Sequence, residues 1–286
     1  MSGNIFLMQK ETGKLFIVST PIGNLEDITY RAVDTLRNVD LILAEDTRHS
    51  AKLISHFQIS KKLIAFHDHN EKSQYMKIIE KLNDGLNIAL ISDAGTPLIN
   101  DPGFNLVRSA KQENITVVPI PGASSPIAAL SASGLPADSF TFLGFVPTKD
   151  SDRINFLEKL KYSSGTSIFF ESPSRILKTT RLIKEIFGSK RNVCLAKEIS
   201  KIHETIITGD IDEIIYYLEE SSDHQKGEFV VLVEGLNYKE IDEKLILLNE
   251  IIPHLLKEMS ASKAAKLAAK ITSLDKETCY KAIIEK

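Results

Sequence analysis

Ile88-Ala-Leu-Ile91, a short apolar run, continues directly into Ser92-Asp-Ala-Gly-Thr-Pro97, a loop of mostly small residues. Two other apolar runs lead into loops of the same kind, Ser19-Thr-Pro-Ile-Gly-Asn-Leu25 and Pro121-Gly-Ala-Ser-Ser125. In an open parallel sheet, ligands bind beyond the carboxyl ends of the strands, where small residues let the backbone approach a ligand closely. The three loops together therefore predict one composite pocket.

Short apolar runs alternate with stretches of helical periodicity from residue 15 to about residue 120. The expected strands are Leu15–Val18, Leu41–Ala44, Leu63–Phe66, Ile88–Ile91 and Ile115–Val118. The expected helices are Thr29–Arg37, Ala51–His56, Gln74–Leu82 and Gly103–Gln112. Such alternation is typical of βαβ units and a mainly parallel sheet.

The pattern changes after residue 125. A short apolar helix is expected over residues 126–135, opened by Pro126 and closed by Gly134. The expected strands are Phe140–Phe145, Ser167–Phe170, Asn192–Ala196, Glu204–Thr208 and Phe229–Val233, and the expected helices lie near 151–161, 174–187 and 210–220. This order predicts a mixed sheet with hairpins.

The length of 286 residues exceeds the roughly 100–150 residues usual for one domain, so two domains are expected. We place an α/β domain that carries the Gly/Pro loops over residues 1–124. A second α/β domain with the mixed sheet follows over residues 125–238, and a helical tail over residues 239–286.

The tail has helical periodicity over Ile241–Met259, Ala261–Lys270 and Lys276–Ile284. The last two helices, joined by a turn at Thr272–Asp275, are compatible with a helix-turn-helix, and a tail that only packs on the body is the alternative. Residues 257–286 hold seven lysines and four acidic residues, whereas the whole chain has a net charge of −3. A basic tail on an acidic body permits a contact with nucleic acid.

The composition, with 26% charged and 43% hydrophobic residues, is ordinary for a soluble globular protein. The chain shows no signal peptide pattern and no apolar stretch of the roughly 20 residues that a membrane span needs. We therefore expect a cytoplasmic protein without a membrane partner. Cys194 and Cys279 lie far apart and indicate neither a disulfide framework nor a Cys-rich metal site.

The loop residues restrict the ligand. Ser19–Leu25 lacks the three glycines of a dinucleotide fingerprint, and the chain has no P-loop pattern, which disfavours familiar NAD and ATP enzymes. Asp93 can accept hydrogen bonds from a ribose diol or an ammonium group, and Gly95 leaves space for a ligand. Asp101 is expected to cap the next helix.

Two polar clusters, Glu45-Asp-Thr-Arg-His49 and His67-Asp-His-Asn-Glu71, follow expected strands and should lie on the same rim as the loops. They suit substrate positioning or acid/base chemistry. A metal site is disfavoured because no third ligand stands at metal spacing, and solvated loop polarity is the other alternative.

In the second half, Glu171, Glu198 and Glu228 stand at the ends of expected strands, where carboxylates are usually solvated. Gly209 closes another strand and is as well explained by a plain turn.

Six ordered strings resemble the tetrapyrrole methylase superfamily of class III S-adenosylmethionine-dependent methyltransferases, and within it the ribosomal RNA small subunit methyltransferase I family. They are Ser19–Arg31, Ala44–His49, Phe66–Glu71, Ile91–Gly103, Ala196–Glu198 and Gly227–Glu228. Tetrapyrrole enzymes of the superfamily have Gly, Gly and Pro where this chain has Ser19, Pro21 and Ile22, so the first loop resembles the rRNA branch.

The resemblance implies two α/β domains that hold S-adenosylmethionine in the cleft between them, usually in a homodimer. It also implies methylation of the ribose 2′-hydroxyl of a cytidine in the decoding region of 16S rRNA, within the small ribosomal subunit. By motif, the cofactor contacts would be Pro21, Gly23, Asp93, Ala94, Gly95, Thr96, Ser124, Ser125, Glu171, Ala196 and Gly209.

Loss of the hydroxyl proton suggests a general base, and the candidates are Asp46, His67, His69 and Glu71, with Arg48 as a contact to phosphate or base. Candidate phosphate contacts elsewhere are Lys149, Arg153, Lys159, Lys161 and the tail lysines. Two alternative functions remain: a methyltransferase acting on a small molecule such as a tetrapyrrole precursor, and a non-catalytic ribosome assembly factor that binds an adenosyl ligand.

Overall fold

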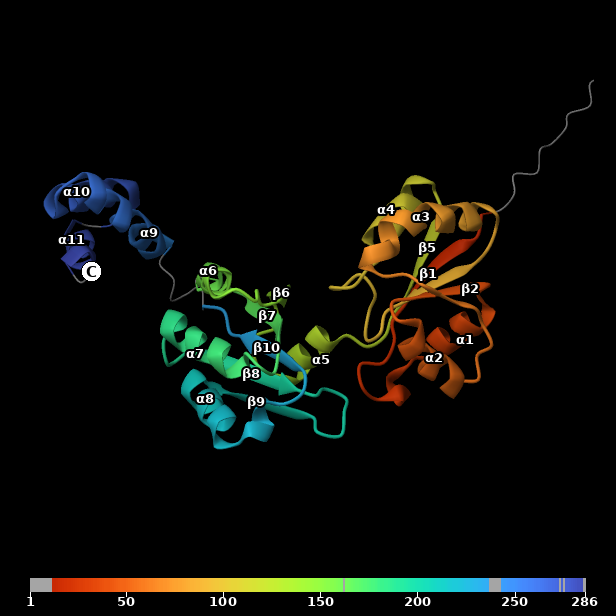
Figure 1. Cartoon of the computed structure of the whole chain (residues 1–286). Coiled ribbons are helices and arrows are strands. Elements are labelled where there is room, and N and C mark those ends of the chain that lie inside the picture. Colours follow the sequence, from red (N-terminus) through yellow and green to blue (C-terminus); the bar gives the residue numbers. More distant parts are fainter. Residues whose placement is uncertain (1–11, 162, 237–242, 273, 275, 285–286) are drawn as a thin grey trace, which may run out of the picture.

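Figure 1 shows the computed structural model of the chain, which describes residues 12–161, 163–236, 243–272, 274 and 276–284. Strands of the first half and strands of the second half form separate five-stranded sheets, and three helices follow at the C-terminal end. Within the described residues, no helix combines the length and the apolar character that crossing a bilayer requires.

The first sheet is parallel throughout, with the order β3-β2-β4-β1-β5. Its strands are β1 (Lys14–Val18), β2 (Leu41–Ala44), β3 (Leu63–Ala65), β4 (Ile88–Ile91) and β5 (Thr116–Ile120). Every residue of β2 and β4 is buried, which is why these strands are continuous apolar runs in the sequence. The predicted parallel sheet is confirmed.

Helices cover both faces of this sheet, so the strand ends remain the accessible edge (Figure 1). They are α1 (Tyr30–Asn38), α2 (Thr47–His56), α3 (Asp68–Asn83) and α4 (Phe104–Gln112). On one face, α1 and α2 pack Leu36 and Ile54 into the core, and on the other face α3 and α4 pack Leu82 and Leu106. Ligands of such three-layer folds bind at the carboxyl ends of the strands.

Two of these helices begin earlier than predicted. The helix α2 begins at Thr47 rather than Ala51, and α3 begins at Asp68 rather than Gln74. The apolar periodicity on which the prediction rested starts only after the polar first turns. Both polar clusters therefore lie at helix N-termini rather than in loops.

The second sheet is mixed, with the order β6-β7-β10-β8-β9. Its strands are β6 (Phe140–Phe145), β7 (Thr166–Glu171), β8 (Asn192–Lys197), β9 (Thr205–Asp210) and β10 (Phe229–Val233). The β6–β7 pair is parallel, and the other neighbouring pairs are antiparallel. The predicted mixed sheet is confirmed, and β8–β9 is a hairpin of consecutive strands.

Three helices cover one face of the second sheet, α6 (Asp150–Leu160), α7 (Ile176–Phe187) and α8 (Ile211–Glu220). A fourth, α5 (Ser125–Ala132), packs Ala129 and Leu130 against the other face, near Ile168 and Val230. The domain boundary predicted after residue 124 stays a prediction. The predicted boundary between residues 238 and 239 lies outside the described residues.

The C-terminal helices are α9 (Glu243–Glu258), α10 (Ala261–Thr272) and α11 (Lys276–Ile284). Their apolar residues form a core of their own, with Leu248 and Ile252 of α9 against Ala265 of α10 and Ile283 of α11. The three helices therefore share a core made of their own residues. Short 3-10 turns complete the fold at Leu25–Asp27 and Ser222–Gln225.

Candidate functional site

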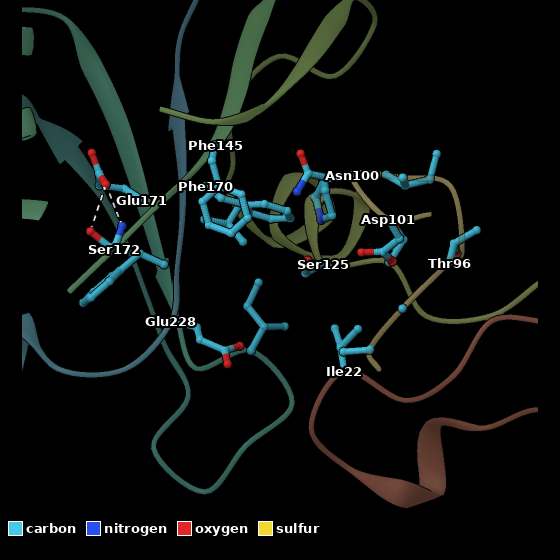
Figure 2. Close-up of a pocket in the computed structure, with 18 of the residues that line it drawn as sticks. Ile22, Thr96, Asn100, Asp101, Ser125, Phe145, Phe170, Glu171, Ser172 and Glu228 are labelled. Atoms are coloured by element: carbon cyan, nitrogen blue, oxygen red, sulfur yellow. Dashed lines mark hydrogen bonds between the residues drawn. The ribbon is translucent and has the colours of Figure 1, made fainter. Parts of the chain in front are cut away.

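A cleft between the two sheets contains a cavity of about 380 Å³, a size typical of ligand pockets. The loops after β1, β4 and β5 line one side of it, and residues at the ends of β6, β7 and β10 line the other (Figure 2). Among the residues predicted to contact a cofactor, six line the cleft: Ala94, Gly95, Thr96, Ser124, Ser125 and Glu171.

Hydrogen bonds tie the three Gly/Pro loops together at this edge of the first sheet. Thr20 and Gly95 exchange backbone hydrogen bonds, with N···O distances of 2.9 and 3.1 Å. The Thr96 hydroxyl donates to the Ala123 carbonyl at 3.1 Å and lies 2.9 Å from the Ser19 hydroxyl. Gly95 has φ +84°, a conformation that favours glycine. The loops thus form one rigid wall.

Aromatic side chains form much of the opposite wall. The rings of Phe145 and Phe170 lie 5.1 Å apart, and Val230 lies beside them in the lining. Ile22 faces them from the first domain (Figure 2). Sequence reasoning missed these four residues as site residues, because apolar side chains in strands and loops are indistinguishable from core residues until the sheets are placed face to face.

The backbone of Glu171 lines the cleft, whereas its carboxylate forms hydrogen bonds within the second domain. One carboxylate oxygen accepts hydrogen bonds from the Ser172 amide at 2.6 Å and from the Arg175 guanidinium at 2.7 and 2.9 Å. The other accepts from the buried Thr179 hydroxyl at 2.6 Å. The side chain is fully buried, so this carboxylate shapes the loop after β7 rather than offering itself to a ligand.

Reciprocal hydrogen bonds join two of the family strings next to the cleft, Ala196–Glu198 and Gly227–Glu228. The Glu198 amide donates to the Glu228 carbonyl at 3.0 Å, and the Glu228 amide donates to the Glu198 carboxylate at 2.8 Å. Lys201 bridges both carboxylates at 2.9 and 3.0 Å. Burial alone would raise the pKa of the Glu198 carboxyl, but the Glu228 amide and Lys201 outweigh it and hold that pKa below its usual range.

Gly227 leaves room for the contact between the Glu198 carboxylate and the Glu228 amide, so a substitution at Gly227 tests this contact. Its φ is +97°, and a Cβ there would lie 2.6 Å from Cγ of Glu198. Gly227→Ala is expected to lower the free energy of unfolding by about 2–3 kcal/mol, measured by urea denaturation. Gly134→Ala is the matched control, because Gly134 has φ +70° and a Cβ there would meet nothing within 4 Å, so only the conformational cost of about 1 kcal/mol is expected. Equal effects of the two substitutions would contradict the proposed role of Gly227.

The first loop reaches across to the β8–β9 hairpin. The Asn24 amide donates to the Ser200 hydroxyl at 3.0 Å, and the same hydroxyl bonds to Asp27. A Cβ at Gly23 would lie 2.6 Å from Cγ of Lys201, so Gly23 allows this close approach of the two domains. Gly23 therefore lies beside the interdomain contact rather than in the lining of the cleft. Pro21 is buried and does not line the cleft either.

Ala196 and Gly209 lie at different ends of the β8–β9 hairpin. Ala196 is fully buried and pairs with Val230 of the cleft lining. Gly209 pairs with Val193 at the opposite end of β8, next to the Glu213 side chain. The register of the hairpin therefore separates Gly209 from the cleft, and the structure does not bring it together with the other predicted cofactor contacts.

Asp46, Arg48 and Asp93 form a rim next to the cleft. The Asp46 carboxylate caps α2 by accepting from the Arg48 amide at 2.8 Å, and this hydrogen bond is the main cause that lowers the pKa of Asp46. The Asp93 carboxylate accepts from the Asp46 amide at 3.1 Å. The Arg48 side chain is 92% exposed. A capping carboxylate with a lowered pKa is a poor proton acceptor at neutral pH.

The other candidates for acid/base chemistry also lie outside the cleft lining. Glu71 is buried and its carboxylate accepts from the Asn105 amide at 2.9 Å, which ties α3 to α4. His67 precedes α3, and its amide donates to the Asn70 side chain at 2.9 Å. His69 is exposed in the first turn of α3. Packing and the Asn105 hydrogen bond explain Glu71 structurally, whereas the buried Nδ1 atom of His67 has no hydrogen-bond partner among the described residues.

Asp101 does not cap α4, contrary to the prediction. The residue before α4 is Gly103, which has no side-chain cap, and Asp101 instead lines the cleft. Burial is the largest cause that raises the pKa of Asp101 to about 6; a Ser92 hydrogen bond opposes this shift, and Glu45, Asp93 and Asp68 add to it. Burial, with Asp93 next, likewise raises the pKa of Glu45.

Arg153, predicted as a phosphate contact, is buried. Its guanidinium donates to the carbonyls of Pro147 and Thr148 and lies 3.2 Å from the Asp150 carboxylate. The long apolar stem and these internal partners explain most of its burial, but the buried Nη1 atom has no hydrogen-bond partner among the described residues. Lys149 and Lys159 are exposed at the two ends of α6.

Residues 14–215 match the family described as Tetrapyrrole (Corrin/Porphyrin) Methylases. The chain belongs to this family. Residues 251–286 match the RsmI C-terminal HTH domain, in agreement with the helix-turn-helix expected for the tail. The tetrapyrrole methylase fold with a cleft between two α/β sheets, expected from the motifs, is confirmed.

Curated relatives extend the match over nearly the whole chain. Ribosomal RNA small subunit methyltransferase I of Vibrio cholerae serotype O1 is 47% identical over 269 residues, which cover 93% of each chain. The protein of that name from Escherichia coli O157:H7 is 45% identical and covers 96% of this chain and 95% of its own. The family resemblance stated from the motifs is thereby confirmed.

Solved structures of two other enzymes share the fold. Uroporphyrin-III-C-methyltransferase from Thermus thermophilus has a TM-score of 0.55 at 18% identity and covers 79% of this chain and 96% of its own. Diphthine synthase has a TM-score of 0.59 at 13% identity, covering 78% and 90%. At these identities the likeness concerns the fold alone.

Proposed function

We propose that this protein is an S-adenosylmethionine-dependent methyltransferase that methylates the ribose 2′-hydroxyl of a cytidine in the decoding region of 16S rRNA, within the small ribosomal subunit. The observation that carries the proposal is the cleft between two sheets in a chain whose close relatives are named small subunit rRNA methyltransferases. Such an enzyme works where ribosomes are assembled, in the cytoplasm.

The cleft suits S-adenosylmethionine in size and in chemistry. Apolar side chains such as Ile22, Phe170 and Val230 can enclose an adenine ring and the methionine methylenes, while the loop Ala94–Thr96 presents backbone groups to polar parts. Ser124 and Ser125 add hydroxyls at the start of α5. The bound cofactor would supply an activated methyl group.

The residues of the cleft would then act mainly by positioning and by excluding water. A methyl group already activated on a sulfonium needs an aligned acceptor, and alignment can supply much of the rate enhancement. Phe145 and Phe170 give the cleft an apolar wall, and a cofactor bound against it would exclude water from the reacting groups. The rim residues Asp46 and Arg48, together with His69, lie where they can position the acceptor RNA.

The homodimer remains part of this proposal. Phe140 is 42% exposed on β6, and Ile127 is 49% exposed on α5, at the face of the second sheet that α6, α7 and α8 do not cover. A second copy packed there would bury these side chains.

The proposal is tested by transferring a labelled methyl group from S-adenosylmethionine to small ribosomal subunits that lack the modification. We expect one methyl group per subunit, located by nuclease mapping and mass spectrometry on the ribose of one cytidine. Label on a base or on protein would contradict the proposal. Turnover of a tetrapyrrole precursor would favour the small-molecule alternative, and cofactor binding without any transfer would favour the assembly factor.

A further inference from the structure

A β-bulge in β6 turns one aromatic side chain into the cleft. Phe142 of β6 pairs with Ile168 of β7. Phe145 pairs with Phe170, so three steps along β6 match two steps along β7. Side chains of a regular strand alternate between the two faces of a sheet, and one extra residue reverses that alternation. Phe145 therefore lies on the same face as Phe142, and the two rings lie 5.1 and 5.0 Å from the ring of Phe170.

Gly144 makes this bulge possible. Its φ is +70°, a conformation that favours glycine. A Cβ at this position would lie 2.7 Å from Oδ1 of Asn100, a cleft residue of the loop after β4, so the missing side chain lets the two domains approach each other here. Without the bulge, Phe145 would share the opposite face with Leu143, which packs in the core covered by α6, α7 and α8.

Hydrogen bonds hold the loop that follows Phe145. The Val146 amide donates to the Phe170 carbonyl at 3.0 Å. The Arg175 guanidinium donates to the Val146 carbonyl at 3.5 Å, and the Arg153 guanidinium donates to the next two carbonyls at 3.3 and 2.7 Å. Two guanidinium groups thus bind three successive carbonyls. The place of the Phe145 ring is therefore set before a ligand binds, which lowers the entropy cost of binding.

Phe145 is the most exposed aromatic residue of the cleft lining. It is 57% exposed, whereas Phe170 is half-buried and Phe229 is 2% exposed. Figure 2 shows the Phe145 side chain on one side of the cavity and Asn100 across from it. An open aromatic face inside a ligand cleft is a stacking surface for a planar group of the ligand.

The proposed acceptor carries a planar group that needs such a surface. A ribose hydroxyl within a stacked RNA strand is flanked by neighbouring nucleotides, which a cavity of about 380 Å³ does not admit. The acceptor nucleotide must therefore leave the stack to reach the cleft, and its base then loses its stacking neighbours. An aromatic side chain of the protein replaces that lost stacking.

We propose that Phe145 is the residue on which the base of the acceptor nucleotide stacks after that nucleotide has left the RNA strand, an inference that rests on the proposed function. Phe145 is then a positioning residue, because a stacked base fixes the ribose hydroxyl relative to the methyl group of the cofactor. Every base has a π face, so the ring holds the nucleotide without reading which base it carries. Ile22, Phe170 and Val230 remain available to enclose the cofactor.

Phe145→Leu tests the proposal, because leucine keeps an apolar side chain and removes the flat ring. We expect kcat/KM for small ribosomal subunits to fall about 10- to 100-fold, the effect that the loss of one base–aromatic stack has on binding. The affinity for S-adenosylmethionine, measured by calorimetry, should stay within about threefold of wild type. Phe145→Tyr should stay within about threefold of wild type in both assays, since a phenol ring also stacks.

Phe142→Leu is the matched control. The Phe142 ring contacts the same Phe170 ring but does not line the cleft. Its replacement should lower the Tm at least as much as Phe145→Leu does, because it removes packing, and leave kcat/KM within about threefold of wild type. Equal losses of kcat/KM in the two leucine variants would overturn the proposal. A loss of cofactor affinity that accounts for the whole loss of activity in Phe145→Leu would overturn it too.

An abasic acceptor shows whether the base is the partner of the ring. Small subunits are reconstituted with 16S rRNA that carries an abasic ribose at the acceptor position. Wild type should lose about 10- to 100-fold in kcat/KM on these subunits, and Phe145→Leu should lie within about threefold of wild type there, because ring and base form one interaction. If Phe145→Leu lowers kcat/KM by the same factor on abasic and intact subunits, the ring does not contact the base and the proposal fails.

The location of the methyl group in the wild-type product separates this proposal from the proposed function. Label on the ribose with equal rates for wild type and Phe145→Leu overturns the role of Phe145 alone. Label on another group of a nucleotide contradicts the proposed function, and the role of Phe145 is then supported if Phe145→Leu, but not Phe142→Leu, slows that transfer. An acceptor that is not a nucleotide overturns both proposals.

Discussion

Glu171→Ala is expected to lower the free energy of unfolding by about 3–5 kcal/mol, the usual effect of removing one partner of a buried, hydrogen-bonded charge pair. Arg175, whose side chain is only 19% exposed, would lose its carboxylate partner at 2.7 Å. The Thr179 hydroxyl and the Ser172 amide would lose their acceptors too. Urea denaturation followed by circular dichroism measures the change.

Glu219→Ala is the matched control for this prediction. Its carboxylate also binds an arginine at 2.7 Å, but Glu219 and Arg181 are 45% and 57% exposed. An exposed pair of this kind contributes about 0.2–1 kcal/mol. If the losses in free energy of unfolding caused by Glu171→Ala and Glu219→Ala differ by less than about 1 kcal/mol, the internal role assigned to the Glu171 carboxylate is contradicted. Glu171 would then again be a candidate cofactor contact.

Replacing Lys263, Lys266 and Lys270 together by glutamine is expected to weaken binding to small ribosomal subunits by about 10- to 100-fold at moderate salt. These lysines are exposed on α10, opposite the buried face that carries Ala264 and Ala268. The slope of log affinity against log salt should fall by about 2–3, because each lysine that no longer neutralises a phosphate lowers it by about one. Filter binding at several salt concentrations measures both quantities.

The control is a triple replacement with the same change in charge on the first domain, Lys77→Gln, Lys81→Gln and Lys111→Gln, at exposed positions of α3 and α4. It should leave subunit binding within about threefold of wild type. Affinity for S-adenosylmethionine should be unchanged in both variants, because the tail helices pack on one another rather than on the cleft. Equal losses of RNA and cofactor affinity in the tail variant would contradict a role of the tail in binding RNA.

Strand positions were the most predictable part of the fold. Fully buried parallel strands such as Leu41–Ala44 and Ile88–Ile91 must be apolar along their whole length, so they stand out between polar loops. Helix starts were less predictable. The first turn of α3, from Asp68, is polar because its side chains cap and bind locally, and such residues carry no apolar periodicity.

Within the site, small residues were easier to predict than charged ones. Gly95 is required by a positive φ and by the backbone pairing with Thr20, and a glycine in a loop after a strand signals such a requirement. The carboxylates of Glu71, Glu171 and Asp101 have the same chemistry in the sequence. Their different roles come from partners far along the chain, such as Asn105 for Glu71.

The sequence by itself determined that three Gly/Pro loops follow strands of a parallel sheet, because strand periodicity and glycine requirements are local properties of the backbone. Only the tertiary structure decided which side chains meet across the cleft. Phe145 and Phe170 come to face Ile22 because the two sheets are set against each other. Asp101 is directed into the cavity while Glu171 is turned away from it, since burial and hydrogen-bond partners depend on residues that only folding brings together.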